Sequence, residues 1–522
     1  MQRFDVVVIG ATPGGIAAAL AAARHGHTVA LVEHHAHVGG MAASGLGKSD
    51  IEHPELIQGL FAEFVGLVRE HYARAHRADS DAYRLCRDGY YYEPSVAEAV
   101  LERMLGAETG ITVRRAVRLA GARVAGGRLV GASLVDRVTG EASELAAEVF
   151  VDATYEGDLY AAAGAAFRTG REGRDAHGEP HAGHIYFDYQ RAVILPRSTH
   201  RGDNRLPAYT YRLCLTTDPA NAAPLEGPPA GYERDTYLPY LDDLKAGRLA
   251  GPARVVEGRG YYPAHFDTPV RALSVTDIPN GKVDANINPR PLAFPFPEEN
   301  EGYLEAGWQA REAIALRHRR LALGLIWFIQ NDPAISAAHR RLAQGYHLPK
   351  DEFTDNGHFP FQLYVREGRR LQGCYTLTEH DVAETGTPGY SRRHADAVAV
   401  GAFPIDSFPV QKRQPGDSIV LEGYLGMLES FTRPYQIPYR IMIPEKLDNL
   451  IVPVAASATH LAFSTIRMEP TWMALGQAAG TAAHLAIKGG VAPRAVPIDE
   501  LQALLVAGGQ VIELPPLSGE HL

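Results

Sequence analysis

The first forty residues alternate between apolar runs and glycine-rich turns. Phe4–Ile9 is nearly all apolar and β-branched, which predicts a buried parallel strand. The turn Gly10–Gly15 follows, and the alanine-rich run Ile16–Arg24 has strong helical propensity. Gly26 stands where a glycine commonly ends a helix, and Thr28–Glu33 predicts a second strand that ends in an acid. The window therefore predicts a complete β-turn-α-β unit.

Later patterns divide the chain into further regions. Apolar positions in residues 51–105 have helical spacing, and residues 111–134 alternate short apolar segments with glycines, as in a small antiparallel meander. Val149–Thr154 predicts another buried strand, which leads into a helix near Asp158. Near the other end of the chain, Asn449–Val454 has a buried-strand pattern, and a helix rich in small residues follows.

Between about residues 165 and 430 prolines and aromatic residues become frequent, and we expect an inserted domain that mixes strands with helices near residues 300–345. Its Pro/aromatic stretch Asn288–Pro297 is either a lid or a surface loop. We predict one domain in two segments, an inserted substrate domain, and a C-terminal tail. The predicted bounds are 1–165 and 431–490 for the first domain, 166–430 for the insertion and 491–522 for the tail.

Composition narrows the class of protein. A chain of 522 residues is long enough for two or three domains, and no apolar run approaches the roughly 20 residues of a membrane-spanning helix. The net charge of −10 without a concentrated basic stretch argues against a nucleic-acid partner. Three cysteines (Cys86, Cys214 and Cys374) make no disulfide framework, so we expect a reducing cytoplasm.

The glycine turn and the terminal acid have a shared chemical use. Glycines let the backbone approach a pyrophosphate closely, and the amide groups at the helix start point toward its negative charge. Gly15 permits close contact between helix and strand, and Glu33 is placed to accept hydrogen bonds from a ribose diol. Thr12 replaces the second glycine of the G-x-G-x-x-G pattern. The combination of strand, turn, helix, strand and acid predicts dinucleotide binding.

The next glycines favour FAD over NAD. Gly39–Met41 and Ser44–Asp50 form a glycine-dense segment just past the acid, where it can run beneath a long cofactor and reach a flavin ring. The alternative is an ordinary surface loop. No second G-x-G-x-x-G follows a strand in the middle of the chain, which weakens an NADPH-dependent interpretation.

The sequence resembles the FAD-dependent oxidoreductases of the glutathione-reductase-like FAD superfamily, distantly akin to the fumarate reductase flavoproteins. The resemblance runs nearly end to end, and its blocks are Gly10–Pro13, Gly39–Met41, Gly45–Gly47, Asp152–Leu159, Leu363–Glu367, Arg369–Arg370, Ile437–Arg440, Asn449–Pro453 and Arg467–Pro470. Relatives often have threonine at the position of Thr12. Many have a histidine where this chain has Phe408, so any chemistry of that histidine is absent here.

The resemblance implies an α/β fold with a Rossmann-like FAD-binding domain and an inserted α+β substrate domain. It also implies that a strand ending in Ala153-Thr154 lies against the FAD, and that the helix after Arg467 directs its positive end at the flavin. The cofactor-binding residues that we predict are Gly10, Thr12, Pro13, Gly14, Gly15, Glu33, His34, Gly40, Met41, Ser44, Gly45, Leu46, Gly47, Val117, Ala153, Thr154, Asp158, Ala456, Met468, Gly476, Gln477 and Ala478.

Four side chains are candidates for the chemistry. His460 is the first candidate for a base that takes a substrate proton, with a structural histidine as the alternative. Arg467 is either an anion clamp, a flavin-edge donor or half of an ion pair. Arg366 and Arg440 supply planar donors for a carboxylate, phosphate or polyol, although such arginines also hold domains together.

Histidine clusters raise the question of a metal. His34, His35 and His37 stand at the expected adenine end, and His177–His184 is dense in potential ligands. Neither spacing matches a specific metal signature, so we predict no metal site. No histidine or cysteine lies in a motif for covalent flavin attachment, and we expect tightly bound, noncovalent FAD.

Three functions remain open at this stage. The first is a dehydrogenase or oxidase that transfers a hydride from a C–H of a small polar substrate (an alcohol, sugar or amine) to flavin N5. The second is a flavin-dependent reductase of an activated double bond, which needs an electron donor, and the chain has no iron–sulfur motif. The third is a flavin-binding assembly protein without turnover.

Overall fold

The computed structural model describes residues 1–188, 193–245, 273–287, 294, 296–383, 391–415, 417, 420–426 and 432–514. Within this part, seven strands form the largest sheet, in the order β3-β2-β1-β6-β5-β4 with β18 also paired to β6. Their bounds are β1 (Gln2–Ile9), β2 (Val29–Val32), β3 (Ile111–Arg114), β4 (Val117–Ala125), β5 (Arg128–Asp136), β6 (Ala142–Asp152) and β18 (Leu450–Ile451).

The central strands of this sheet are parallel. β1 pairs with β2 through Val6–Val29 and with β6 through Val6–Val149, and β18 adds to the other edge of β6. A strand from the far end of the sequence therefore completes the sheet that the first residues begin. This arrangement confirms the predicted α/β, Rossmann-like class, while the predicted domain boundaries stay a prediction.

Strand β1 is buried on both faces. Val6 and Val8 belong to the core between the sheet and the helices that include α1, whereas Val7 and Ile9 belong to a second core with β4, β5 and β18. Successive side chains of a strand point to opposite faces, so a continuous apolar run is what two covered faces require. The pattern of residues 4–9 thus encodes a central strand.

The predicted meander differs from the structure at one end. β4 and β5 form an antiparallel hairpin, and β5 continues antiparallel to β6. Ile111–Arg114, however, forms β3, which runs parallel to β2 at the sheet edge. The two residues between β3 and β4 include Ala116 with a φ of +55°, a left-handed conformation that redirects the chain there.

Two long helices cover one face of the sheet. α1 (Pro13–Arg24) packs directly on α14 (Glu469–Gly489), at glycines whose missing side chains allow the approach. A Cβ on Gly476 would meet the Gly14 carbonyl oxygen at 2.0 Å, and one on Gly480 would meet the Ala18 carbonyl oxygen at 2.3 Å. The small-residue pattern of the second helix therefore serves helix packing.

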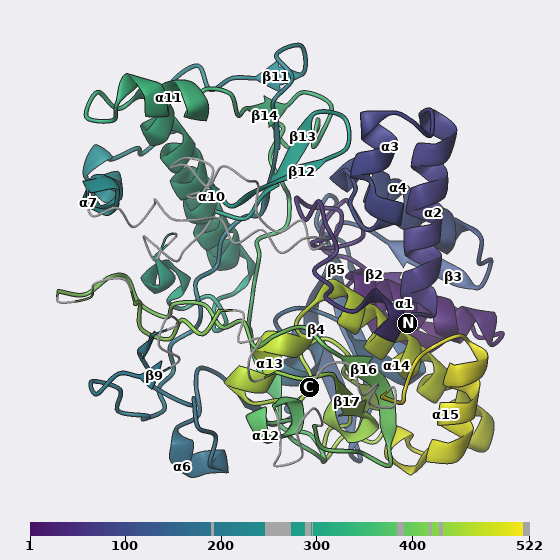
Figure 1. Cartoon of the computed structure of the whole chain (residues 1–522). Coiled ribbons are helices and arrows are strands. Elements are labelled where there is room, and N and C mark those ends of the chain that lie inside the picture. Colours follow the sequence, from purple (N-terminus) through teal and green to yellow (C-terminus); the bar gives the residue numbers. More distant parts are fainter. Residues whose placement is uncertain are drawn as a thin grey trace, which may run out of the picture.

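The predicted helical region forms a separate stack, seen at the upper right of Figure 1. Its helices are α2 (Leu60–Ala75), α3 (Asp81–Leu85) and α4 (Pro94–Gly106), with short turns η1 (Pro54–Leu56) and η2 (Arg87–Gly89). The buried face of α2 includes Phe61, Phe64 and Val68, at the spacing of one helix side. The helical prediction for this region is confirmed.

The central part of the chain forms the upper left of Figure 1, around the long helix α10 (Trp308–Asn331) and α11 (Ala337–Ala343). The expected helices near residues 300–345 are therefore present. Most of the Pro/aromatic stretch Asn288–Pro297 lies outside the described residues. The other elements between residues 158 and 349, of which α6 and β9 lie at the lower left of Figure 1, are α5 (Asp158–Ala162), β7 (Phe167–Arg168), α6 (Arg174–His177), β8 (Phe187–Asp188), β9 (Val193–Ile194), β10 (Leu213–Thr216), β11 (Ala222–Ala223), η3 (Arg234–Tyr237), α7 (Pro239–Lys245), β12 (Val275–Ile278), β13 (Lys282–Ala285), η4 (Pro297–Asn300) and β14 (Leu348–Pro349).

The last described residues are more ordered than a tail. Residues 498–507 form α15, whose Leu501 and Leu505 are fully buried, and Gln510 donates to the Ala474 carbonyl oxygen of α14 at 3.1 Å. Residues 515–522 lie outside the described part. The remaining elements are β15 (Arg370–Leu371), α12 (Glu379–Val382), β16 (Ala397–Gly401), β17 (Tyr435–Pro438), η5 (Tyr439–Met442), α13 (His460–Ile466), η6 (Pro493–Ala495) and α15 (Ile498–Ala507).

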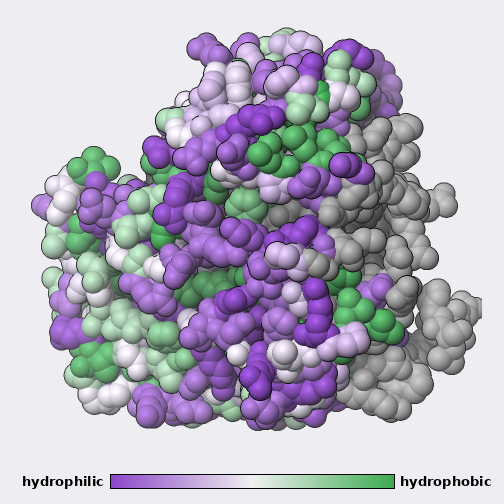
Figure 2. All heavy atoms as spheres, turned by 90° about the vertical axis from the view of Figure 1, so that its left-hand side faces the viewer, coloured by the Kyte–Doolittle hydropathy of each residue, from purple (hydrophilic) through white to green (hydrophobic). Residues whose placement is uncertain are grey.

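The outer surface is mostly polar on the face shown in Figure 2, with apolar side chains in small separate groups. Among the described helices, none combines the length and apolar character that crossing a bilayer requires. The three cysteines are free thiols, with Cys86 and Cys214 buried and Cys374 exposed.

Candidate functional site

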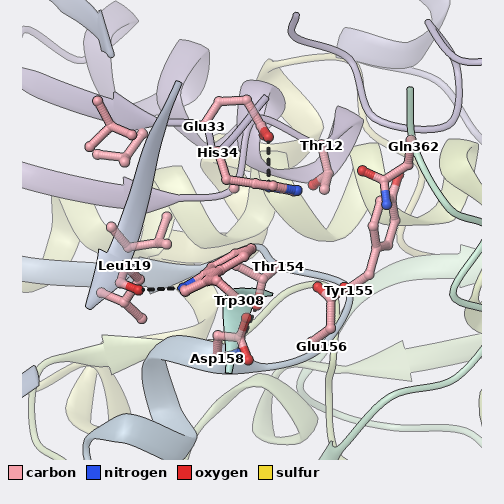
Figure 3. A pocket seen from close by; sticks show the side chains of 14 residues that line it. Thr12, Glu33, His34, Leu119, Thr154, Tyr155, Glu156, Asp158, Trp308 and Gln362 are labelled. Atoms are coloured by element: carbon pink, nitrogen blue, oxygen red, sulfur yellow. Dashed lines mark hydrogen bonds and ion pairs between the residues drawn. The ribbon is translucent and has the colours of Figure 1, made fainter. Parts of the chain in front are cut away.

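A cavity lies at the carboxyl ends of β1, β2 and β6, where an open parallel sheet binds ligands. The empty space among its lining atoms is about 420 Å³, including the part that opens to solvent. Figure 3 shows Thr12 and Glu33 on one side and Trp308, Glu156 and Asp158 facing them. The lining residues are Ile9, Gly10, Thr12, Val32, Glu33, His34, Val117, Leu119, Thr154, Tyr155, Glu156, Asp158, Trp308 and Gln362.

The glycine turn beside this cavity is held by close backbone packing and by the Thr12 side chain. Gly10 has a φ of +97°, and a Cβ on Gly15 would meet the Gly10 carbonyl oxygen at 1.9 Å. Thr12 precedes α1 as its N-cap: its hydroxyl accepts from the Gly15 amide at 3.2 Å and donates to the Ala153 carbonyl oxygen at 2.9 Å. Thr12 thus fixes the turn at the start of α1 beside the cavity, so it is compatible with the dinucleotide motif.

Glu33 is a buried carboxylate at the end of β2. It accepts from the Ala11 amide at 2.8 Å and the His35 amide at 2.9 Å, and it forms an ion pair with His34 Nδ1 at 2.9 Å. Burial alone would raise its pKa, but the attraction of His34 and the hydrogen bonds outweigh it and lower the pKa to about 2. A carboxylate held ionised beside a cavity is the acceptor that a ribose diol requires.

The cavity, the glycine turn and Glu33 together suit the adenosine end of FAD. The glycines let the turn pack closely against the protein backbone beside the cavity, and the Glu33 carboxylate provides an acceptor for ribose hydroxyls. Trp308 adds an aromatic side chain on the far side of the cavity, where its Nε1 donates to the Leu119 carbonyl oxygen at 2.8 Å. The residues present therefore fit the predicted cofactor.

The predicted flavin-side segment is fully buried and held by its backbone. The Tyr155 hydroxyl accepts from the Met41 amide at 3.0 Å and donates to Glu469 Oε1 at 2.7 Å. Ser44 Oγ accepts from the Gln362 amide at 2.8 Å. A Cβ on Gly45 would meet the Arg212 carbonyl oxygen at 1.7 Å, which explains the glycine there. This segment is therefore not an ordinary surface loop.

The predicted cofactor residues fall into two groups. The structure brings to the cavity wall Gly10, Thr12, Glu33, His34, Val117, Thr154 and Asp158. Buried elsewhere, outside this wall, are Pro13, Gly14, Gly15, Gly40, Met41, Ser44, Gly45, Leu46, Gly47, Ala153, Ala456, Met468, Gly476, Gln477 and Ala478. The second group includes the predicted flavin-side residues, whose assignment to FAD stays a prediction.

Gln477 has a different role in the structure. Its Oε1 accepts from the Leu60 amide at 2.8 Å, and its Nε2 donates to the Gly508 carbonyl oxygen at 3.2 Å. Both ends of the amide therefore connect α14 to α2 and to the end of α15. Because those contacts use the side chain, we assign Gln477 to helix packing and no longer to the cofactor.

His460 forms a hydrogen-bonded pair with a buried acid. It is the first residue of α13, and its Nδ1 lies 2.7 Å from Glu367 Oε2. Its backbone amide donates to Glu172 Oε2 at 2.9 Å. Arg370, which is fully buried, neutralises the acids, with Nη1 at 2.8 Å from Glu172 and Nε at 3.0 Å from Glu367. His460 is therefore oriented by a fixed carboxylate, as bases in enzymes commonly are.

Arg366 and Arg467 lie around the same two aromatic rings. The Arg366 guanidinium stands 4.3 Å from the Tyr364 ring centre and 4.0 Å from the Phe408 ring centre. The Arg467 guanidinium is 6.0 Å and 5.4 Å from those centres, and its Nη1 donates to the Tyr364 hydroxyl at 2.9 Å. Phe408 thus supports a guanidinium here.

Arg440 is not brought to this group. Its guanidinium forms an ion pair with Asp396 at 2.8 Å, lies over the Tyr375 ring and is about half exposed. Arg369 is likewise used elsewhere, in an ion pair with Asp158 at 3.0 Å. We therefore remove Arg440 from the catalytic candidates, because a neighbouring acid already uses its planar donors.

In one histidine cluster the potential ligand atoms lie close enough together to bind a metal ion. Glu33, His34 and His35 each offer a ligand atom, and these atoms lie within 4.8 Å of one another. The Glu33 carboxylate already accepts two backbone amides and faces the cavity, and the assignment of this cluster to the cofactor without a metal stays a prediction. In the second cluster, His181 pairs with Glu379 and His380 Nε2 lies 3.1 Å from the His177 carbonyl oxygen.

Several residues at the site were not predicted from the sequence. Trp308 and Gln362 come from the central part of the chain, which carries no cofactor motif, and only the fold brings them to the cavity. Glu367 adjoins Arg366 in a block that resembles the family, and Glu469 lies in the Arg467–Pro470 block. For these two acids, their place inside blocks that resemble the family was the available signal.

The solved structures match only about a third of this chain. A myxobacterial FAD-dependent halogenase, CndH, matches with 23% identity over 30% of this chain and 38% of its own (TM-score 0.21). Mycobacterium smegmatis Sdh1 matches with 18% identity over 30% and 35% (TM-score 0.22), and the glycerol-3-phosphate dehydrogenase of Bacillus halodurans with 15% over 29% and 34% (TM-score 0.20). The matched parts span little more than a third of those chains, and we draw no argument from them. No curated protein matches.

The family comparison covers far more of the molecule. The family described as FAD dependent oxidoreductase matches residues 5–505, which include the glycine turn, Glu33, the His460–Glu367 pair and α14. The cavity at the carboxyl ends of the parallel strands agrees with that match, and FAD is the cofactor it implies. The chain belongs to the FAD dependent oxidoreductase family.

Proposed function

We propose that this protein is an oxidoreductase that removes a hydride from a C–H of a small polar substrate, an alcohol, sugar or amine, with His460 as the base. FAD, when bound, supplies the two-electron acceptor for that hydride. The observation that carries the proposal is the hydrogen bond between His460 Nδ1 and Glu367 Oε2 at 2.7 Å.

The carboxylate determines which nitrogen of His460 can act. Glu367, which forms an ion pair with Arg370, takes up Nδ1 in a hydrogen bond at 2.7 Å, so Nε2 is the ring nitrogen left for a substrate. Nε2 is then the atom that takes the proton from a substrate O–H or N–H while the hydride leaves the adjacent carbon. Glu367 and Arg370 are both buried, which keeps water from competing for that carboxylate.

The finer assignments rest on general features of the chain. Three free thiols support a reducing, cytoplasmic location, and a net charge of −10 supports a small molecule over a nucleic acid as partner. We also propose residues 1–165 and 431–490 as the two segments of the FAD domain, because β18 completes the sheet that β1 begins.

The test is anaerobic reduction of the FAD-loaded protein by a panel of alcohols, sugars and amines. We expect at least one compound to bleach the flavin absorbance. His460→Gln and Glu367→Gln should slow that reduction about 100-fold, since a positioned base contributes about that much, and leave the bound-flavin spectrum unchanged.

The matched control is His53→Gln, because His53 Nδ1 also contacts a carboxylate, Glu55 at 3.1 Å, but on the surface. This control should reduce at the wild-type rate. If His53→Gln slowed flavin reduction as much as His460→Gln, the assignment of His460 as the base would be wrong. Absence of reduction by every compound would favour a flavin-binding protein without turnover.

A further inference from the structure

Arg366 is a charged side chain in the interior. Its exposed fraction is 1%, and it is stacked against Tyr364 and Phe408. Nη1 donates to the Ala208 carbonyl oxygen at 2.6 Å, and Nη2 to Asn286 Oδ1 at 3.4 Å. Both of these acceptors are neutral. The Nε–H group has no hydrogen-bond partner among the described residues.

The charge of Arg366 is uncompensated by any direct ion pair within the described part of the chain. Burial lowers its pKa to about 9, and the nearby charge of Arg467 acts in the same direction. An isolated charge in the interior is costly unless an opposite charge meets it, so such a group in a folded protein points to an absent anion.

Other buried arginines show what compensation looks like in the same molecule. Arg212 lies 2.9 Å from Asp284 and 2.8 Å from Asp50, and Arg370 is paired with both Glu172 and Glu367. Each of these guanidiniums therefore has two carboxylates. The fold is able to neutralise buried arginines fully, and it does not do so at Arg366.

Arg467 adds a second positive charge beside the same rings. Its exposed fraction is 5%, and its closest acid is Asp406, whose Oδ2 lies 3.5 Å from Nη2. Arg467 stands two positions before Glu469, the first residue of α14. The Arg366–Arg467 pair therefore combines two guanidiniums with the carboxylate of Asp406, and counted over these three groups alone one positive charge is left for a monoanion to balance.

We infer that Arg366 and Arg467 form a subsite for a substrate carboxylate, so that the oxidised molecule is a small polar carboxylic acid anion. This inference rests on the proposed function and names its substrate class. The open Nε–H edge of Arg366 is a planar donor that suits a planar carboxylate, and Phe408 and Tyr364 hold the guanidinium flat against their faces. A phosphate dianion exceeds the surplus charge of the pair.

The experiment measures binding without turnover. The FAD-loaded protein is titrated with acetate, lactate, inorganic phosphate and glycerol at constant ionic strength, and the melting temperature and flavin absorbance are followed. A ligand that binds only the folded state raises the melting temperature. We expect a rise with the two carboxylates and none with glycerol, and phosphate should bind at least tenfold more weakly than lactate.

Variants place the binding at the pair. Arg366→Met should weaken carboxylate binding about tenfold to a hundredfold, as expected for loss of a charge-assisted hydrogen bond, and should retain the flavin spectrum. Arg366→Lys keeps the charge without the planar fork and should recover part of the affinity. Arg103→Gln, which removes an exposed arginine paired with Glu70, is the matched control and should bind as the wild type does.

The outcomes separate this inference from the proposed function. Equal binding of glycerol and acetate, preferential binding of phosphate, or unchanged carboxylate affinity in Arg366→Met would each overturn the carboxylate subsite. If glycerol or another neutral alcohol then reduces the flavin, the proposed function stands alone. Tight carboxylate binding without flavin reduction by any carboxylate or neutral compound would support the subsite and overturn the proposed function.

Discussion

Glu33 and Arg366 are both buried charges at a proposed binding site, yet their surroundings differ. Glu33 accepts hydrogen bonds from the backbone amides of Ala11 and His35 and forms an ion pair with His34. These partners lie in the same N-terminal unit of the chain as Glu33. Arg366 meets neutral acceptors and two aromatic rings, drawn from segments far apart in the sequence. At the cofactor site, protein groups alone stabilise the Glu33 carboxylate. At the proposed substrate site, the Arg366 guanidinium has no opposite charge in a direct ion pair among the described residues.

The difference reflects what each end must do. A cofactor site that stays occupied gains from rigid, preformed contacts, and the Thr12 hydroxyl fixes the glycine turn through hydrogen bonds with Gly15 and Ala153. A substrate site must release its product, so the ligand itself supplies part of the opposite charge, which leaves when the ligand dissociates. The predictions below test whether this contrast between satisfied and unsatisfied groups is real.

The largest effect is expected at the turn. Gly15→Ala places a Cβ at 1.9 Å from the Gly10 carbonyl oxygen, and backbone on both sides cannot shift. We expect a loss of about 4 kcal/mol or more in the free energy of unfolding and loss of FAD from the purified protein. Urea unfolding and the flavin absorbance measure these. Gly106→Ala, where a Cβ meets no atom within 4 Å, is the control, and an equal loss there would contradict the steric explanation.

The next effect compares two buried arginines. Arg370→Met leaves Glu172 and Glu367 without their cation, and we expect a loss of about 3 kcal/mol in the free energy of unfolding. Arg366→Met removes an uncompensated charge instead, so its stability should stay within about 1 kcal/mol of the wild type or increase. Both are measured by urea unfolding in buffer without carboxylates. A loss of stability in Arg366→Met as large as that in Arg370→Met would contradict the conclusion that the Arg366 charge is uncompensated.

A smaller effect concerns pH and Glu469. Burial raises the pKa of this carboxyl to about 8, and the charge of Asp50 adds to the shift. Its folded pKa lies above its ordinary value, so the folded state binds the extra proton, and stability falls as pH rises from about 4.5 toward 8.

Glu469→Gln keeps an acceptor for the Tyr155 hydroxyl but cannot ionise. Relative to the wild type, the variant should gain about 2 kcal/mol between pH 5 and pH 8.5, because relaxation around a buried carboxyl reduces the full linkage value. Melting temperatures across that range measure it. Parallel pH curves for the two proteins would show that Glu469 is already ionised at low pH.

The smallest effect is expected at Arg440. The Arg440 side chain is about half exposed, although its partner Asp396 is buried, and pairs that are open to solvent contribute little. Arg440→Gln should therefore change the free energy of unfolding by less than about 1 kcal/mol, measured by urea unfolding. A loss of several kcal/mol would place Arg440 among the buried arginines and contradict its assignment to the surface.

Sequence alone determined the cofactor half of this protein. The apolar run of residues 4–9, the glycine turn, the alanine-rich helix and Glu33 act on neighbours within one short window, so local periodicity and turn geometry suffice to predict them. The parallel sheet, the class of cofactor and the cavity wall from Gly10 to His34 followed directly.

Only the tertiary structure decided the other half. Arg366 and Arg440 look alike in the sequence, and their difference arises from whether Asp396 or two aromatic rings lie beside them after folding. Trp308, Glu367 and Gln477 likewise take their roles from partners more than 30 residues away. Pairing over such distances depends on how the elements pack, and the residue types at those positions do not encode it.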